Sequence, residues 1–276
     1  MLTGVPKTAL GVARIRAGES ARTDRLFNDP YAAAFVAAMP EAYADTAERS
    51  DAARAIGARI AVQVVVRTRF YDDYLLAGTS KGIRQVVLLA AGLDTRAFRL
   101  EWPAGTKVFE IDLPDMVDFK EQVMADAGAA PTAKRSVVRA DLTADWASAL
   151  SGAGLDPAQP TAWLIEGLLV YLTHEDAAGL LETVGQLSAT GSTLSCEQGR
   201  SAMQLAQIAS ARKAAGALEA VSLWQGGVED IPAWLADHGW SVETFELGAL
   251  SASYGRPLTT ETQTGFLIAT TSRCRG

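Results

Sequence analysis

The stretch QVVLLAAGLDTRAFRLEWPAGTKVFEIDLP, residues 85–114, joins two apolar runs through a loop in which Gly92 is the one glycine before an Asp-Thr-Arg triplet. Both runs are rich in Val, Leu, Ile and Phe, which is typical of strands buried on both faces of a parallel sheet. Parallel strands need a crossover between them, and the intervening segment is long enough to supply one. The stretch therefore predicts a β-α-β unit.

The rest of the chain repeats this alternation of strand and helix. Short apolar runs bounded by turns predict strands at 83–91, 106–112, 136–142, 161–172, 192–198, 241–247 and 264–273. Helices are expected between them at 113–127, 146–150, 177–187 and 231–239, with Thr173 to Asp176 as the start signal of the third. This order predicts an α/β fold with a seven-stranded sheet whose last strand is an antiparallel partner inside the sheet.

The first eighty residues are predicted to be helical throughout. An Asn-Asp-Pro start signal precedes a helix over 29–39, and apolar positions at helical spacing predict a long amphipathic helix over 51–76, which Gly78 should end. We expect residues 1–80 to form a helical cap within the same domain. Residues 81–276 should form the core, with a helical insert near 198–230.

Composition narrows the classes of function. Twenty-five basic and 32 acidic side chains give a net charge of −7, which would repel nucleic acid. The two cysteines have no cysteine or histidine cluster with metal-ligand spacing around them, so no metal site is expected. No window has the roughly 20 uncharged apolar residues of a spanning helix. We expect a cytoplasmic protein without a nucleic-acid or membrane partner.

The loop after the first strand separates two classes of nucleotide-binding enzyme. A dinucleotide oxidoreductase needs a G-x-G-x-x-G loop, whereas residues 90–95 read Ala-Ala-Gly-Leu-Asp-Thr. Asp94 would also place a carboxylate beside a pyrophosphate. A cofactor with a cationic centre and no phosphate has no such conflict. An ordinary turn with positive φ at Gly92 and a helix cap at Asp94 or Thr95 is the alternative interpretation.

Acidic residues follow the next three predicted strands. Glu110 and Asp112 alternate on one face about twenty residues beyond the loop, where an acid can accept hydrogen bonds from ribose hydroxyls. Asp141 ends the third run and alone would be a helix cap. Glu166 stands in an apolar run, so it must be paired with an arginine or face a ligand. Ligands of open α/β sheets bind outside these strand ends.

Several stretches together carry a family resemblance. The chain resembles the leucine carboxyl methyltransferase-like family of S-adenosyl-L-methionine (SAM)-dependent methyltransferases, in particular its actinobacterial branch with polyketide carboxyl O-methyltransferases. The resembling stretches are ARTDRLFNDP (21–30), VRTRFYDDYLL (66–76), residues 85–114, RADLTADW (139–146), PTAWLIEGLLVYL (160–172), WLADHGW (234–240) and YGRP (254–257). The resemblance implies a class I, Rossmann-like methyltransferase fold with a helical cap over the SAM pocket.

The resemblance also implies roles for individual residues. Arg67 would grip the carboxylate of the methionine moiety, and Glu166 would face its amino group. Gly92 would lie beside the same moiety, and Asp112 would hold the ribose. Asp141 and Leu142 would contact the adenine. We expect the neighbouring Ala90, Asp94 and Glu110 to contribute to the same cofactor site.

The acceptor is expected to be a small molecule with a carboxylate. The chain has two histidines, of which His238 is interpreted as structural and His174 as a helix-start or surface residue, and an ionised carboxylate needs no general base. We expect a natural product of polyketide or peptide type, oriented by Arg22 or by its neighbours Arg14 and Arg16, with Tyr171 at the reacting centre. Methylation of a phenol or other hydroxyl is the alternative. A SAM-binding protein without turnover is the alternative from another class. The sequence does not predict the oligomeric state.

Overall fold

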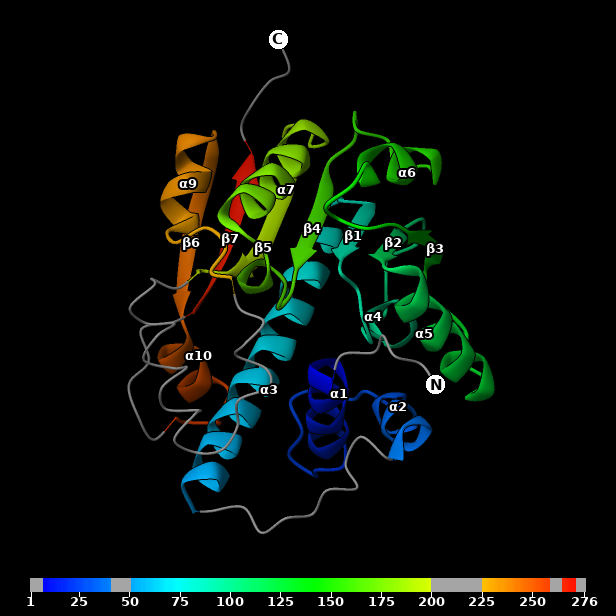
Figure 1. Cartoon of the computed structure of the whole chain (residues 1–276), viewed down its shortest axis with the longest axis vertical. Helices are drawn as coiled ribbons and strands as arrows, with labels where there is room; N and C mark the ends of the chain where they lie inside the picture. The colour runs from blue at the N-terminus through cyan, green and yellow to red at the C-terminus, as the bar shows by residue number, and fades with distance from the viewer. Residues whose placement is uncertain (1–6, 41–50, 200–224, 259–264, 272–276) are drawn as a thin grey trace.

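The computed structural model describes residues 7–40, 51–199, 225–258 and 265–271, and its centre is one seven-stranded sheet (Figure 1). The strand order is β3-β2-β1-β4-β5-β7-β6. Strands β1 to β5 pair in parallel, and β7 runs antiparallel between β5 and β6. The predicted α/β fold with an antiparallel last strand is therefore confirmed. The strands are β1 Gln85–Leu89, β2 Lys107–Asp112, β3 Lys134–Arg139, β4 Thr161–Ile165, β5 Thr193–Glu197, β6 Trp240–Glu246 and β7 Gly265–Thr271.

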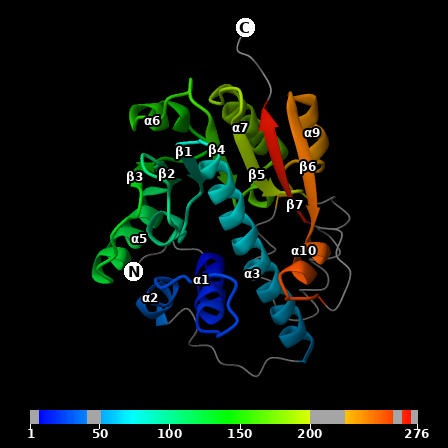
Figure 2. The ribbon, with the colours of Figure 1, turned by 180° about the vertical axis from the view of Figure 1, so that it is seen from behind.

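Helices cover both faces of the sheet. Successive residues of β1 belong to different hydrophobic clusters, with Val86 and Leu88 on one face and Val87 and Leu89 on the other. Figure 1 shows α7 in front of the sheet, and Figure 2, seen from behind, shows α3 in front of it. The α7 face also carries α6 and α9, whereas the α3 face carries α5 and α10. The helices are α5 Pro114–Asp126, α6 Trp146–Gly152, α7 His174–Gln186, α9 Ile231–Asp237 and α10 Leu247–Ser253.

The cap lies at the carboxyl ends of the parallel strands. Helix α1, Lys7–Ser20, and helix α2, Ala32–Ala38, stand below the end of the sheet to which the β4 arrow points (Figure 1). Helix α3, Asp51–Ser80, runs from this cap to the sheet, where Tyr74 donates a hydrogen bond to the carbonyl of Trp163 in β4. One helix is thereby shared between the cap and the core. Among the described residues, no helix is long and apolar enough to span a membrane.

Several predicted boundaries shift for local reasons. The run 161–172 is no single strand, because β4 ends at Ile165 and Gly167 turns the chain with φ +68° into a short 3-10 helix, η2 Leu169–Tyr171. Helix α3 passes Gly78 and ends at Ser80, just before Gly82 with φ +109°. Helix α10 follows a strand without a marked start signal and was not predicted. Most of the insert predicted near 198–230 lies outside the described residues.

The predicted helix starts differ in accuracy. Thr173 caps α7 as expected, since its side chain accepts a hydrogen bond from the backbone of Asp176. Asp29 accepts hydrogen bonds from the backbone N–H groups of Tyr31 and Ala32, so it forms the turn that leads into α2, which begins three residues later than predicted. At both helix starts, a side-chain oxygen accepts hydrogen bonds from backbone N–H groups that have no partner within the helix.

Candidate active site

A cavity of about 1110 Å³ opens at the carboxyl ends of the parallel strands, under the cap. It reaches from the ends of β1, β2, β4 and β5 to the facing sides of α1 and α3. Its polar lining residues include Gly92, Asp94, Asp112, Glu166, Tyr171 and Glu197, together with Arg14 and Arg16 of α1 and Arg67 of α3. The residues that the sequence named after β1, β2 and β4 therefore line one cavity, whereas those after β3 do not.

The loop after β1 is tightly turned against the end of β2. Gly92 has φ +46°, and Ala90 is the one described non-glycine residue with a positive φ, at +51°. The backbone N–H of Gly92 donates to Asp112 Oδ2 at 2.5 Å, and that of Leu113 donates to Oδ1 at 2.7 Å. Burial raises the pKa of Asp112 against these two hydrogen bonds. Its carboxylate is held at the cavity edge, beside the glycine loop.

Glu166, just beyond β4, lies between two arginines. Its Oε1 is 2.8 Å from Arg67 Nε, and its Oε2 accepts a hydrogen bond from Arg96 Nη1 at 2.7 Å. Burial opposes its ionisation, but the charges of Arg96 and Arg67 lower its pKa. The pairing of Glu166 with arginines is one of the two expected alternatives, and because Glu166 also lines the cavity, its contact with a ligand stays a prediction.

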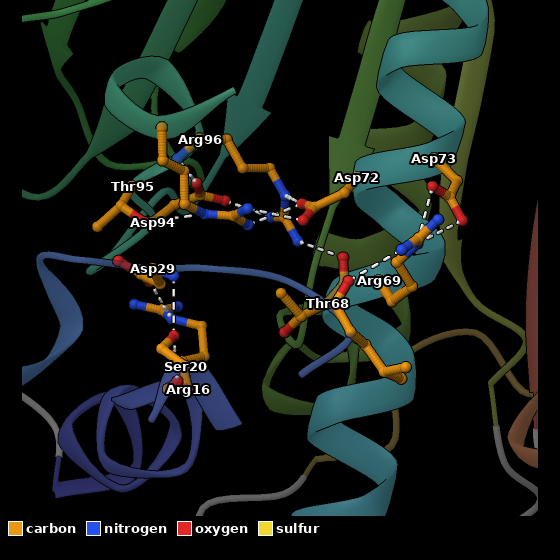
Figure 3. A network of polar contacts seen from close by, with 12 residues as sticks. Arg16, Ser20, Asp29, Thr68, Arg69, Asp72, Asp73, Asp94, Thr95 and Arg96 are labelled. Carbon is orange, nitrogen blue, oxygen red and sulfur yellow. Dashed lines mark hydrogen bonds and ion pairs between the residues drawn. The ribbon is translucent and has the colours of Figure 1, made fainter. Parts of the chain in front are cut away.

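Arg96 is the centre of a buried ion-pair network that sequence reasoning missed. Its Nε bonds Asp72 on α3 at 2.7 Å, and its Nη1 bonds both Asp94 and Glu166, as Figure 3 shows for the two aspartates. Arg99 makes two further bonds to Asp72, each 2.7 Å long. Both arginines belong to the one-turn helix α4, Arg96–Arg99. The sequence signal for this network was the arginine that directly follows Asp94 and Thr95.

Asp94 is fixed in its ionised form by this network. Burial penalises its charge, but Arg96 and Lys120 outweigh the penalty and lower the pKa of Asp94 to about 2. Its Oδ1 also accepts a hydrogen bond from the backbone N–H of Arg96, so it fixes the turn before α4, whose N-cap position is taken by Thr95. Because Asp94 also lines the cavity, a ligand there meets a carboxylate that is ionised at neutral pH and paired with Arg96.

Glu197, at the end of β5, is a second residue that the sequence analysis did not select. Its carboxylate accepts hydrogen bonds from Arg67 Nη1 at 3.0 Å and from the backbone N–H of Gly167 at 3.0 Å. It ends an apolar run in the same way as Glu166, so the rule about acids at strand ends could have found it. Arg67 thus faces two carboxylates, one from β5 and one from the loop after β4.

Glu110 does not line the cavity, which corrects its expected place beside the cofactor. Its Oε2 is 2.7 Å from both Lys120 Nζ and Arg135 Nη2, in a buried ion-pair cluster with α5 and β3. Glu110 and Asp112 do share a face of β2, but two residues of strand separate them by about 7 Å along its axis. Only Asp112 reaches the strand end, while Glu110 is covered by α5.

Asp141, Leu142 and Arg22 are also placed outside the cavity lining. The carboxylate of Asp141 accepts hydrogen bonds from the backbone and the hydroxyl of Thr143, so in this structure it caps a turn. Arg22 is exposed and pairs with Asp24, which corrects its expected place at the acceptor. Neither histidine of the chain lines the cavity.

Three of the other residues expected at the acceptor line the cavity, and one of them is already held in an ion pair. Tyr171 lies on η2 at the cavity wall, and Arg14 projects from α1. Arg16 is buried, 2.9 Å from Asp29, and it donates to the backbone carbonyl of Leu93 at 2.5 Å. Arg16 therefore connects the cap to the loop after β1, and Figure 3 shows its pairing with Asp29.

Comparison with known proteins decides the family. The model of the leucine carboxyl methyltransferase family matches residues 9–185. The chain belongs to this family. A relative from Parafrankia sp. (strain EAN1pec), named as a candidate SAM-dependent methyltransferase, is 47% identical over 99% of this chain and 88% of its own length. A relative from Streptomyces coelicolor with the same description is 43% identical over 94% of this chain and 90% of its own.

A solved structure shows the same fold at low sequence identity. A DUF574 family protein from Streptomyces avermitilis superposes with a TM-score of 0.54 at 17% identity, over 94% of this chain and 96% of that chain. A methyltransferase-type structure from Thermobifida fusca superposes with a TM-score of 0.51 at 16% identity, over 95% of this chain and 94% of that chain. The sheet and these neighbours agree with the class I SAM methyltransferase fold. Membership of the family, together with the SAM-dependent relatives, makes SAM the cofactor.

The residues of the site fit SAM. The methionine end of SAM is zwitterionic, and the cavity places Arg67 directly beside Glu166, so a cation and an anion are available side by side. Asp112, at the end of β2, offers carboxylate oxygens next to the close backbone approach at Gly92. Asp94 and Glu197 add carboxylates to the same lining, which suits a ligand with a cationic sulfonium. No group of residues in the described part of the chain could hold a metal ion.

Proposed function

We propose that this family member is an O-methyltransferase that transfers the methyl group of SAM to a carboxylate of a small-molecule natural product, of polyketide or peptide type. Bound SAM supplies the methyl group on a sulfonium. Arg67 binds its carboxylate, Glu166 its amino group and Asp112 its ribose hydroxyls, with the loop 90–94 against the methionine moiety. Contacts of Asp141 and Leu142 with the adenine stay a prediction.

The lack of a suitable base among the described residues that line the cavity supports the preference for a carboxylate acceptor. No described lining residue is a histidine, lysine or cysteine. The lining carboxylates Asp94, Glu166 and Glu197 are paired with arginines, and Asp112 accepts two backbone hydrogen bonds. A hydroxyl acceptor would need one of these groups to take its proton. A carboxylate is ionised at neutral pH and needs only alignment with the methyl group.

The experiment combines binding and product analysis. Titration calorimetry with SAM is followed by incubation with a panel of apolar carboxylic acids and of phenols matched to them in shape. We expect mass spectrometry to find a gain of one methylene on acids, and mild alkali to remove it because the product is an ester. Alkali-stable ethers from the phenols would overturn the carboxylate proposal. Tight SAM binding without any methylated product would favour a non-catalytic SAM-binding protein.

A further inference from the structure

The cavity continues beyond the SAM-facing loops into a space between α1 and α3, here called the acceptor lobe. From α1 it is lined by Ala9, Gly11, Val12 and Ile15, and from α3 by Gly57, Ile60, Gln63 and Val64, with Thr8 and Arg14 of α1 and Arg54 of α3 in the same lining. Residues three or four apart share one helix face, so each helix presents one side to this space. A cavity of about 1110 Å³ exceeds the roughly 300–1,000 Å³ typical of pockets for one ligand. It has room for an acceptor beside SAM.

Two glycines widen the acceptor lobe. Gly11 lies within α1 and Gly57 within α3, and a Cβ at either position would meet no described atom within 4 Å. Close packing therefore does not require a glycine at either place. A glycine inside a helix costs about 1 kcal/mol relative to alanine. What the two glycines provide is open volume on the helix faces that line the cavity.

Gln63 is the one amide side chain among the described residues that line the cavity. It lies one helical turn before Arg67 on the same face of α3, and its amide makes no hydrogen bond to a described residue. An amide can donate to one oxygen of a carboxylate while the other oxygen attacks. A cation in that place would withdraw more electron density from the nucleophile than a neutral donor does.

We propose that the acceptor is a carboxylic acid with a bulky apolar body, that this body fills the acceptor lobe at Gly11 and Gly57, and that the Gln63 amide binds its carboxylate. This inference rests on the carboxylate proposal above. In the reaction a carboxylate oxygen forms a bond to the methyl carbon as the carbon–sulfur bond breaks and its electron pair returns to sulfur. The negative charge of the acceptor and the positive charge of the sulfonium cancel, and no proton is released.

The first test narrows the lobe without touching the SAM site. Gly11→Leu and Gly57→Leu each place a side chain in the lobe. We expect the dissociation constants of a size series of probes, benzoate, 2-naphthoate and decanoate, to rise by about tenfold or more for the two larger acids in the complex with S-adenosylhomocysteine. The affinity for SAM should stay within about twofold of wild type. Gly18→Leu is the matched control, because Gly18 also lies in α1 with open surroundings but does not line the cavity.

The second test changes the polar group. Gln63→Met keeps length and removes the donor, so binding of 2-naphthoate should weaken about five- to tenfold, as expected for one hydrogen bond. Gln63→Glu should weaken it further by charge repulsion, while SAM affinity is retained in both variants. Gln122→Met is the control for the loss of an amide, because Gln122 is an exposed residue of α5 outside the cavity lining.

The outcomes separate this inference from the proposed function. Suppose that the wild-type enzyme makes methyl esters and that the Gly11 and Gly57 variants bind every acid with wild-type affinity. The acceptor then does not bind in the acceptor lobe, whereas the carboxylate proposal stands. If the enzyme makes only ethers, the carboxylate proposal fails, and with it the role of Gln63. Failure of wild type to bind any of the three acids, or an equal loss in Gly18→Leu, would also overturn the acceptor lobe.

Discussion

The two ends of the cavity are built in opposite ways. At the SAM end, Arg67, Asp94, Arg96, Glu166 and Glu197 form a continuous network of ion pairs from α3, α4 and the strand ends. At the acceptor lobe, apolar side chains and two glycines face an open space. The first region is ordered by interactions within the protein before any ligand arrives, whereas the second is left to be filled by its ligand.

This difference matches what each ligand requires. SAM is the same in every turnover, so a fixed arrangement of charges lowers the cost of ordering the site when SAM binds. Burying charged groups costs desolvation free energy, and ion pairing offsets most of that cost only when the geometry of the pair is good. The acceptor lobe uses volume and burial of apolar surface, which can change between relatives by single substitutions without disturbing the SAM site.

Arg96→Met should break the ordered end most severely. The change leaves Asp94, Glu166 and Asp72 without their shared buried partner, and removal of one member of a buried ion pair costs about 3–5 kcal/mol. We expect the free energy of unfolding in urea to fall by that amount. Arg69→Met is the control, because the Arg69–Asp73 pair is about 40% exposed and should contribute at most about 1 kcal/mol. Equal effects in the two variants would contradict a structural role of the network.

Because of the Arg96 network, we also expect the free energy of unfolding to depend on pH in the acid range. The pKa of Asp94 is about 2 in the folded protein against an ordinary value of 3.8, so folding favours the ionised form. Its contribution of about 2 kcal/mol is complete above about pH 4 and is lost as the pH falls through about 2. We expect the urea midpoint to decrease over this range. In Asp94→Asn the decrease should be shallower, and an unchanged slope would show that Asp94 does not titrate in this way.

The sequence predicted the parts of the site that follow from strand topology. Acids at the ends of buried runs, such as Asp112 and Glu166, were found because parallel strands bring their carboxyl ends together at one edge. Arg67 was found only through resemblance to a family, since nothing in a helical charge pattern distinguishes it from Arg69. The structure shows the difference: Arg67 lines the cavity and Arg69 pairs with Asp73 outside it.

The sequence could not predict how deeply a side chain is buried or which residue it pairs with. Glu110 and Asp112 satisfy the same alternation, and only the position of α5 over β2 assigns the first to Lys120. The sequence did not indicate that Arg96 is buried. A helix of four residues is too short for the spacing of its apolar residues to show which side faces the core. The strand predicted at 161–172 ignored a single glycine, Gly167, whose positive φ turns the chain toward the cavity.

Arg67→Lys tests whether the SAM end of the cavity binds SAM through the paired hydrogen bonds of a guanidinium group and not through positive charge alone. Lysine keeps the positive charge between Glu166 and Glu197 but cannot make two parallel hydrogen bonds to a carboxylate. Calorimetry should show about tenfold weaker SAM binding. The acids that bind in the acceptor lobe should keep their affinity. Arg69→Lys, two residues along α3, should change neither, and equal weakening there would point to a general effect on the helix.

The smallest effect is expected at Ala90, where the loop after β1 enters the cavity. A left-handed alanine costs about 1–2 kcal/mol, and Ala90 has φ +51°. Ala90→Gly relieves this strain but adds chain entropy of about 0.5–1 kcal/mol to the unfolded state, so we expect a net gain in stability of at most about 1 kcal/mol. Ala91→Gly, next to it, has no positive φ to relieve and should lose stability. If both variants lose stability to the same extent in urea denaturation, the strain at Ala90 contributes nothing measurable to the folded state.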